Sequence, residues 1–165
     1  MTIPFSDGRE TLPDVLRDGR QSPRAFSILR GTQRLFRSLG MSSVAELPLT
    51  NGWRADIVSI AKDGTIHIVE VKSSVADFRA DQKWREYMDY CDRFYFAIDS
   101  NTPENLIPQE AGLIVADTYA AIIIREAPSM RTAGARRRAT LLTFARCAAD
   151  RLHNIGDPAY FAGGG

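Results

Sequence analysis

The fold is decided by residues 54–72, which read RADIVSIAKDGTIHIVEVK. Two runs rich in β-branched residues flank an Asp-Gly pair at 63–64, a dipeptide that favours the tight turn of a β-hairpin. Side chains alternate between the two faces of a strand, so Glu70 and Lys72 share one face. A hairpin that turns at 63–64 returns Asp56 toward Glu70. The stretch therefore predicts two carboxylates and a lysine at one end of a sheet.

This combination of side chains suits the hydrolysis of a phosphodiester with a divalent metal ion. Carboxylate oxygens are the ligands that Mg²⁺ prefers, and a lysine supplies positive charge beside the attacked phosphate. A solvated ion pair is the alternative explanation for Glu70 and Lys72. Their neighbours along the strand are otherwise apolar, where solvated charges are not expected. The pattern therefore favours a catalytic site.

Composition limits the class of protein. The chain has 165 residues, enough for one domain with a core. Its net charge of +1 gives no overall signal for nucleic-acid binding. Cys91 and Cys147 lack metal-site spacing, so a reducing cytoplasm fits and neither zinc nor a disulfide is expected. No run approaches ~18 apolar residues and no signal-peptide pattern opens the chain, so we expect a cytoplasmic protein with no membrane contact.

Periodicity and turn signals give the order of elements. We expect an N-terminal arm at 1–21, a single domain at 22–155 and a flexible tail at 156–165. The patterns predict a helix over 23–39, strands over 44–49, 54–61 and 65–72, a helix over 78–90, strands over 93–98, 112–117 and 120–124, and a helix over 136–153. On the last helix the inward face is assigned to Leu141, Leu142, Ala145, Ala148, Ala149 and Leu152. This order predicts an α/β sheet covered by helices.

The order resembles that of the PD-(D/E)xK nuclease superfamily, the restriction-endonuclease-like fold, whose core is αβββαβ. Residues 22–98 match this core, with Asp56 on the second strand and Glu70-Val71-Lys72 on the third. Ala55 stands where the motif has a proline, a substitution that the superfamily tolerates. The resemblance implies a central mixed sheet flanked by helices, with extra C-terminal strands and a helix.

A narrower resemblance is to the MmcB-type bacterial DNA repair proteins, over residues 22–155. Six stretches carry it: SPRAF at 22–26, WRAD at 53–56, EVKSS at 70–74, DFRADQKW at 77–84, YMDYCDRFYF at 87–96 and GLIVAD at 112–117. It implies a role in DNA damage repair, with DNA as a partner and other repair proteins as further candidate partners.

By analogy with the superfamily, Asp56, Glu70 and the backbone carbonyl of Val71 ligate Mg²⁺ or Mn²⁺. Lys72 orients the attacking water and stabilises charge on the phosphate oxygens. Gln82 resembles a glutamine that several of these nucleases place beside the metal on a helix.

Other polar residues near the motif each have two interpretations, one functional and one structural. Glu46, on the preceding predicted strand, is a candidate extra ligand or a surface strand residue. Asp77 and Asp81 are alternatives to Gln82, although we interpret both as charges that favour a helix N-terminus. His67 lies on the strand face opposite Glu70, and we interpret it as a packed or exposed residue rather than a catalytic one.

Arginines from three segments are candidates for DNA contact: Arg30, Arg34, Arg54, Arg136, Arg137 and Arg138. A solvated helix face, packing at a strand entrance and a solubilising helix start are the respective alternatives. Three arginines at the start of a helix oppose its dipole, which favours a ligand there. Phosphate contacts from such patches would be dependent on salt and independent of base sequence.

Two functions follow from these features. The first is a metal-dependent nuclease that hydrolyses phosphodiester bonds in DNA during repair. The second is a non-catalytic repair module that binds DNA or a protein partner on a nuclease fold. The intact Asp56, Glu70 and Lys72 favour the first, and the near-zero net charge favours the second. RNA as a substrate stays open.

Overall fold

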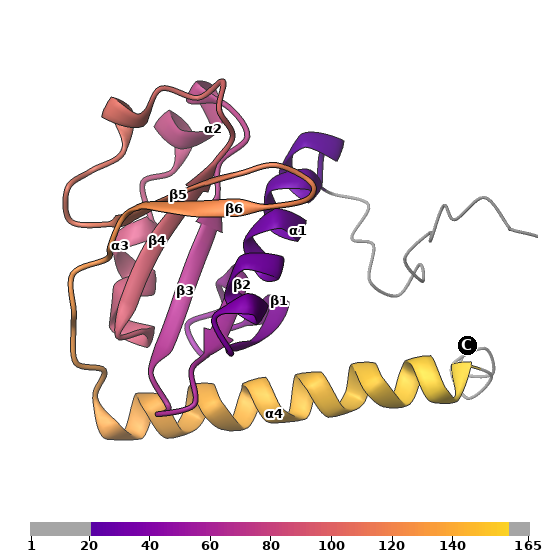
Figure 1. Cartoon of the computed structure of the whole chain (residues 1–165). Coiled ribbons are helices and arrows are strands. Elements are labelled where there is room, and N and C mark those ends of the chain that lie inside the picture. Colours follow the sequence, from indigo (N-terminus) through magenta and orange to yellow (C-terminus); the bar gives the residue numbers. More distant parts are fainter. Residues whose placement is uncertain (1–20, 159–165) are drawn as a thin grey trace, which may run out of the picture.

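The computed structural model describes residues 21–158 (Figure 1). Most of the expected arm at 1–21 and of the expected tail at 156–165 therefore lies outside the described residues. The helical elements are α1 (Pro23–Ser38), α2 (Val75–Ala80), α3 (Trp84–Tyr87), the 3-10 turns η2 (Met88–Tyr90) and η3 (Glu104–Leu106), and α4 (Gly134–Gly156).

The strands form one six-stranded mixed sheet. They are β1 (Ser42–Pro48), β2 (Arg54–Ile60), β3 (Ile66–Val71), β4 (Arg93–Ile98), β5 (Gly112–Ala116) and β6 (Ala121–Arg125), side by side in chain order. β1, β2 and β3 pair antiparallel, β3, β4 and β5 pair parallel, and β6 is antiparallel to β5. The order α1-β1-β2-β3-α2-β4 is the αβββαβ core, so the expected restriction-endonuclease-like fold class is confirmed.

Local sequence explains how α1 is held on the sheet. The Ser22 hydroxyl accepts a hydrogen bond from the Ala25 N–H, and Pro23 occupies the first turn. Gly31 lies so close to the β5–β6 turn that a Cβ there would come 2.0 Å from the Asp117 carbonyl oxygen. Any larger residue at this position would push the helix off the turn.

Two apolar cores lie on the two faces of the sheet. Beneath α1, Phe36, Tyr95 and the buried His67 ring pack together, which agrees with a packed role for this histidine. On the other face Trp84 stacks on Phe94 beneath α3. The motif residues Glu70 and Lys72 emerge on this second face, next to the segment that carries α2 and α3.

The single helix predicted over 78–90 is wrong. The chain forms α2, breaks at 81–83 and restarts as α3 and η2. The Ser74 hydroxyl caps α2 by accepting a hydrogen bond from the Asp77 N–H, so the helix begins at Val75, three residues before the expected start. Asp81 ends α2 with an extended backbone, and its carboxylate accepts a hydrogen bond from the Lys83 N–H. Short side chains that satisfy nearby backbone groups in this way interrupt a helix.

The inward face predicted for the last helix is wrong in part. Leu141 and Ala148 pack on the core, whereas the side chains of Leu142 and Leu152 are 60% and 71% exposed. Ala145 and Ala149 are exposed as well. α4 packs against β1 and continues past the sheet (Figure 1), so it has a partner along one narrow face only. Within residues 21–158, no helix is long and apolar enough to cross a membrane.

Candidate active site

The antiparallel register of β2 and β3 brings the two motif carboxylates together. Ile57 pairs with Val69, which places Asp56 opposite Glu70 on the same face of the sheet. The backbone N–H of Asp56 donates to Glu70 Oε1 at 3.2 Å. The N–H of Val71 donates in turn to Asp56 Oδ2 at 2.8 Å. The carboxylates are therefore held by each other's strands, one residue from the end of β3.

Burial makes this pair of carboxylates costly to ionise. Glu70 is only 6% exposed. Burial, with the charge of Glu46 adding to it, raises the pKa of Asp56 to about 6, despite the opposing Val71 N–H and Lys72. Burial and then the charge of Asp56 raise the pKa of Glu70 well above its usual range. A pair in this condition binds either a proton or a cation.

The third motif residue, Lys72, forms an ion pair with another carboxylate, that of Asp81. Its Nζ lies 2.7 Å from Asp81 Oδ2, and the two side chains are 7% and 12% exposed. Burial alone lowers the pKa of Lys72, but the hydrogen bond and charge of Asp81 outweigh it and the net direction is upward. Asp81 is thus not a charge at a helix N-terminus, as the sequence suggested: it ends α2 and holds the lysine.

The structure places Gln82 outside this buried cluster. Its side chain is exposed, and its amide donates to the Arg79 carbonyl at 3.2 Å. The helix break at 81–83 causes this, because it directs Asp81 rather than Gln82 toward Lys72. Gln82 as a catalytic residue therefore stays a prediction.

Glu46 lies across β2 from Glu70 but is engaged elsewhere. Its carboxylate forms an ion pair with Arg54 and accepts a hydrogen bond from Gln21. Its backbone has a φ of 54°, unusual for a non-glycine residue, and its carbonyl accepts a hydrogen bond from Arg151 of α4 at 3.2 Å. Glu46 contributes negative charge near Asp56, and its role as a ligand stays a prediction.

The donor set at the pair fits a hard divalent cation. The half-buried Asp56 carboxylate, the buried Glu70 carboxylate and the backbone carbonyl of Val71 offer oxygen only, which suits Mg²⁺ or Mn²⁺. In the part of the chain that the structure covers, no group of three or more His, Cys, Asp or Glu side chains is arranged to hold a metal. The fit therefore rests on Asp56 and Glu70, with the remaining coordination positions open to water and phosphate.

The candidate DNA-contact arginines have different surroundings. Arg34 donates to the Tyr119 carbonyl at 3.5 Å, Arg54 pairs with Glu46, and the Arg136 guanidinium lies over the Tyr90 ring. Arg30 is half-buried and Arg138 is exposed. Arg137 donates to the Gly64 carbonyl at 2.9 Å and to Asp92. This arginine fastens α4 to the sheet, a role that its place in a basic run does not suggest.

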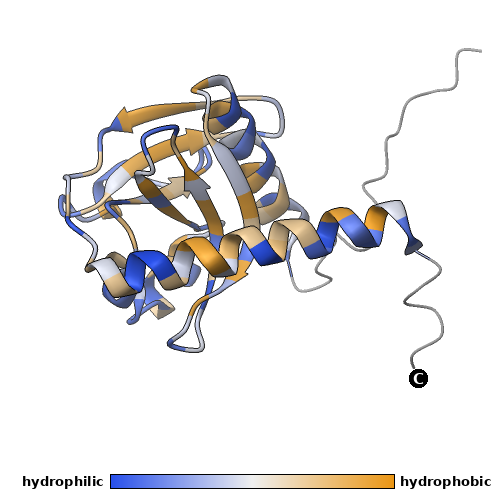
Figure 2. Ribbon diagram, turned by 90° about the horizontal axis from the view of Figure 1, so that it is seen from below, coloured by the Kyte–Doolittle hydropathy of each residue, from blue (hydrophilic) through white to orange (hydrophobic). Residues whose placement is uncertain are grey.

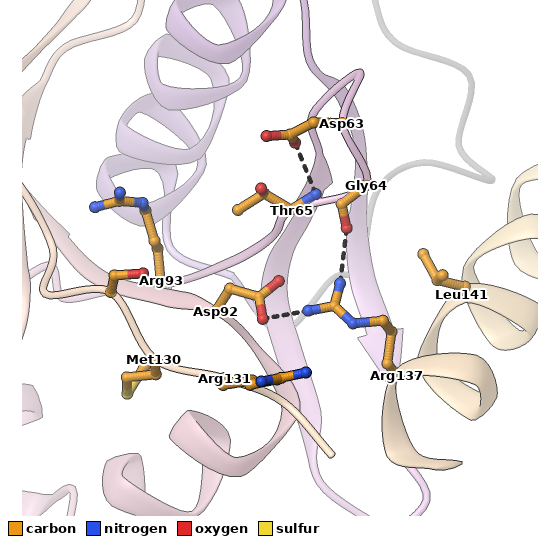
Figure 3. Close-up of a pocket in the computed structure, with 10 residues that line it drawn as sticks. Asp63, Gly64, Thr65, Asp92, Arg93, Met130, Arg131, Arg137 and Leu141 are labelled. Carbon is orange, nitrogen blue, oxygen red and sulfur yellow. Dashed lines mark hydrogen bonds and ion pairs between the residues drawn. The ribbon is translucent and has the colours of Figure 1, made fainter. Parts of the chain in front are cut away.

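A cavity of about 610 Å³ lies at the opposite end of β3, between the β2–β3 turn, the start of β4 and the start of α4 (Figure 3). Arg131 and Arg137 line it together with Asp92. The Asp92 carboxylate accepts hydrogen bonds from the Ile66 N–H at 2.8 Å, from Thr132 and from Arg137. Sequence reasoning missed this buried acid, although an aspartate directly before an apolar strand was a usable signal.

The fold and the site define the class: a restriction-endonuclease-like domain with an Asp, Glu and Lys set at the end of adjacent strands. Within that class, residues 12–159 match the model of the MmcB-like DNA repair protein family, and the chain belongs to this family. The resemblance inferred from the sequence is thereby confirmed. A comparison with curated proteins finds no match.

Solved structures agree with the fold. A protein of unknown function from Silicibacter pomeroyi, SPO1766, is 40% identical with a TM-score of 0.81, over 88% of this chain and 97% of that one. A repair endonuclease from Pyrococcus abyssi is 15% identical with a TM-score of 0.33, over 55% of this chain and 42% of that one. The structure of the EndoMS–dsDNA2 complex is 14% identical with a TM-score of 0.32, over 53% of this chain and 41% of that one. Scores this low carry no argument about function.

Proposed function

We propose that the protein hydrolyses phosphodiester bonds in DNA during repair, with Mg²⁺ or Mn²⁺ held by Asp56 and Glu70. The observation that supports this most is the close pair of Asp56 and Glu70, whose pKa values are both raised chiefly by burial. The charge of Glu46 adds to the rise at Asp56, and the charge of Asp56 adds to the rise at Glu70. Raised pKa values in paired buried acids are typical of functional sites. Membership of a DNA repair family makes DNA the substrate to test first.

The side chains would divide the work as follows. A bound metal ion supplies positive charge to the phosphate and lowers the pKa of a coordinated water. Asp56 and Glu70 hold that charge in a region shielded from solvent, where electrostatic effects are strong. Lys72 stabilises the negative charge that develops on the phosphate oxygens. Asp81 keeps Lys72 protonated and positioned through the 2.7 Å ion pair.

Binding of the DNA backbone would fall to exposed arginines around the domain. Arg138 is exposed, Arg54 is exposed although it pairs with Glu46, and Arg137 is engaged by Asp92. Arg30, Arg34 and Arg136 complete the proposed set. Such contacts release counterions, so affinity should fall steeply as salt rises.

The test is a cleavage assay with single-stranded, nicked, flapped and branched DNA, and with matched RNA, in Mg²⁺ or Mn²⁺. We expect Lys72→Ala to slow cleavage by at least ~100-fold, the range for loss of one group that stabilises developing charge. Lys62→Ala is the matched control: this exposed lysine sits at the β2–β3 turn, at the other end of the sheet, and its loss should leave cleavage unchanged.

A metal-binding readout separates the two candidate functions. Mn²⁺ should raise the melting temperature of the wild type and leave the Asp56→Asn variant unchanged, because ligand binding to the folded state stabilises it. A protein that binds DNA, ignores both metals and cuts no substrate would be the binding module instead. Its near-neutral net charge would then point to a partner that supplies DNA affinity.

A further inference from the structure

A stripe of mostly small and apolar residues runs along one exposed flank of α4. Its members recur every three or four residues, the spacing that keeps side chains on one side of a helix. They are Arg138, Leu142, Ala145, Ala149, Leu152 and Gly156, and all six are exposed. Figure 2 shows α4 lying across the underside of the domain with no described helix or strand over it. We name this surface the α4 stripe.

The α4 stripe is distinct from the face by which α4 packs on its own domain. That inner face carries Leu141, Phe144 and Ala148, which contact the core on the sheet. At 100° per residue the centre of the stripe lies roughly a quarter of a turn away from it. Leu142 and Leu152 keep 60% and 71% of their side chains in solvent. Two large aliphatic side chains are therefore exposed along this one line of the helix.

The sequence of the α4 stripe is complementary to itself in the antiparallel direction. If two α4 helices cross near Cys147, Leu142 of one copy meets Leu152 of the other, and Ala145 meets Ala149. Each position thus has a partner of its own kind, large beside large and small beside small. Alanines at the centre allow the two helix axes to approach closely. Such a match with no change of register favours a second copy over an unrelated helix.

Charges beside the α4 stripe complement each other in the same arrangement. Antiparallel pairing brings Arg146 of each copy next to Asp150 of the other, twice by symmetry. Arg138 comes against Gly156 of the second copy, at the C-terminal end of that helix. Within its own helix Arg138 sits at the positive end of the dipole, an unfavourable place, whereas against a helix C-terminus it is favourable.

We infer that the protein forms a two-fold symmetric homodimer through antiparallel contact of the α4 stripes. A closed two-fold contact uses the same patch on both copies, as this pattern requires. The shared length from 138 to 156 is about 27 Å at 1.5 Å per residue. α4 continues past the sheet, so a second helix can reach it beside the domain body (Figure 1). A contact along one helix is small, and we expect dissociation in the roughly micromolar range.

Sedimentation velocity of the full chain, from about 1 to 200 µM to bracket such an affinity, tests the dimer. We expect a concentration-dependent dimer for the wild type and a monomer for Leu142→Arg and Leu152→Arg. Ile122→Arg on β6 is the matched control, because Ile122 is also 60% exposed but lies away from α4. A wild type that stays monomeric throughout overturns the inference, as does a control that dissociates like the α4 variants.

Two further experiments test the direction of the pairing. Arg146→Asp should weaken the dimer by roughly fivefold, and adding Asp150→Arg should restore it, since two exposed pairs are exchanged for two repelling ones. In a Cys147→Ala background, mixed Leu142→Cys and Leu152→Cys chains should crosslink to each other through a short thiol reagent. Two Leu142→Cys chains lie about 15 Å apart along the axis in the antiparallel model, so efficient crosslinks between them alone would indicate parallel helices and overturn it. The remaining cysteine, Cys91, is fully buried.

Discussion

The two ends of β3 both hold buried acids, but in opposite electrostatic conditions. At the start of the strand, Asp92 receives hydrogen bonds from Ile66, Thr132 and Arg137. Burial there raises its pKa, but these donors outweigh it and the pKa falls below the usual range. At the far end, Asp56 and Glu70 have two backbone N–H groups and each other, and their pKa values rise.

The difference separates a structural acid from a candidate functional one. A buried acid with a full set of donors stabilises the fold, and the loss of one partner leaves the rest unsatisfied. A buried acid pair without such donors costs stability, and the fold tolerates that cost where the charge has another use. Asp92 ties the β2–β3 hairpin and α4 together, while the Asp56 and Glu70 pair leaves capacity for a cation.

The largest effect is expected at the start of β3, where hydrogen-bond donors surround Asp92. Asp92→Ala should lower the free energy of unfolding by about 3–5 kcal/mol, because Arg137 and the donors of Thr132 and Ile66 lose their acceptor inside the protein. Urea denaturation measures it. Asp89→Ala is the matched control: this neighbouring acid is 70% exposed and 4.0 Å from Arg136, so its loss should cost under ~0.5 kcal/mol. A similar loss in the free energy of unfolding for both variants would show that Asp92 has no special structural role.

The next largest effect is a pH dependence of the free energy of unfolding, which should have opposite signs at the two ends of β3. The pKa of Asp56 is about 6 in the folded protein against 3.8 for the ordinary group, so the folded state binds more protons than the unfolded state between those values. Stability from this site is therefore greatest below about pH 4 and is lost as pH rises toward 7, by roughly 3 kcal/mol. Asp92, with a lowered pKa, works in the opposite direction and loses its contribution only in acid.

Metal-free unfolding of the wild type and of an Asp56→Asn, Glu70→Gln double variant, between pH 4 and 7, separates these contributions. The variant lacks the titrating pair, so its stability relative to the wild type should increase as pH rises. Curves that stay parallel over this range would show that the pair is not strained by its burial. The Asp92 network is present in both proteins and cancels in the difference.

The site's strand geometry could be predicted from the sequence because it depends on local rules. The Asp-Gly turn and strand alternation place Asp56 near Glu70, and in the structure their neighbours Ile57 and Val69 pair while the Asp56 N–H donates to the Glu70 carboxylate. The partner of Lys72 could not be predicted in this way. It depends on the break at 81–83, where side-chain contacts override a helical pattern that looked continuous from residue 78 to 90. The Asp92 network joins residues 26 to 45 positions apart, which no local pattern reveals.

The smallest expected effect concerns Gln82, where the sequence and the structure diverge most. Gln82→Ala should change the free energy of unfolding by less than ~0.5 kcal/mol, because the side chain is exposed and its amide donates to the Arg79 carbonyl of the same segment. Asp81→Asn, one residue earlier, is the comparison, since it removes the acceptor of a buried lysine. Cleavage rates, measured on the substrate that the wild type cuts, decide the function of Gln82. Unchanged cleavage would leave it a surface residue, whereas a large loss of cleavage with full stability would show that the 81–83 segment turns it toward DNA in the complex.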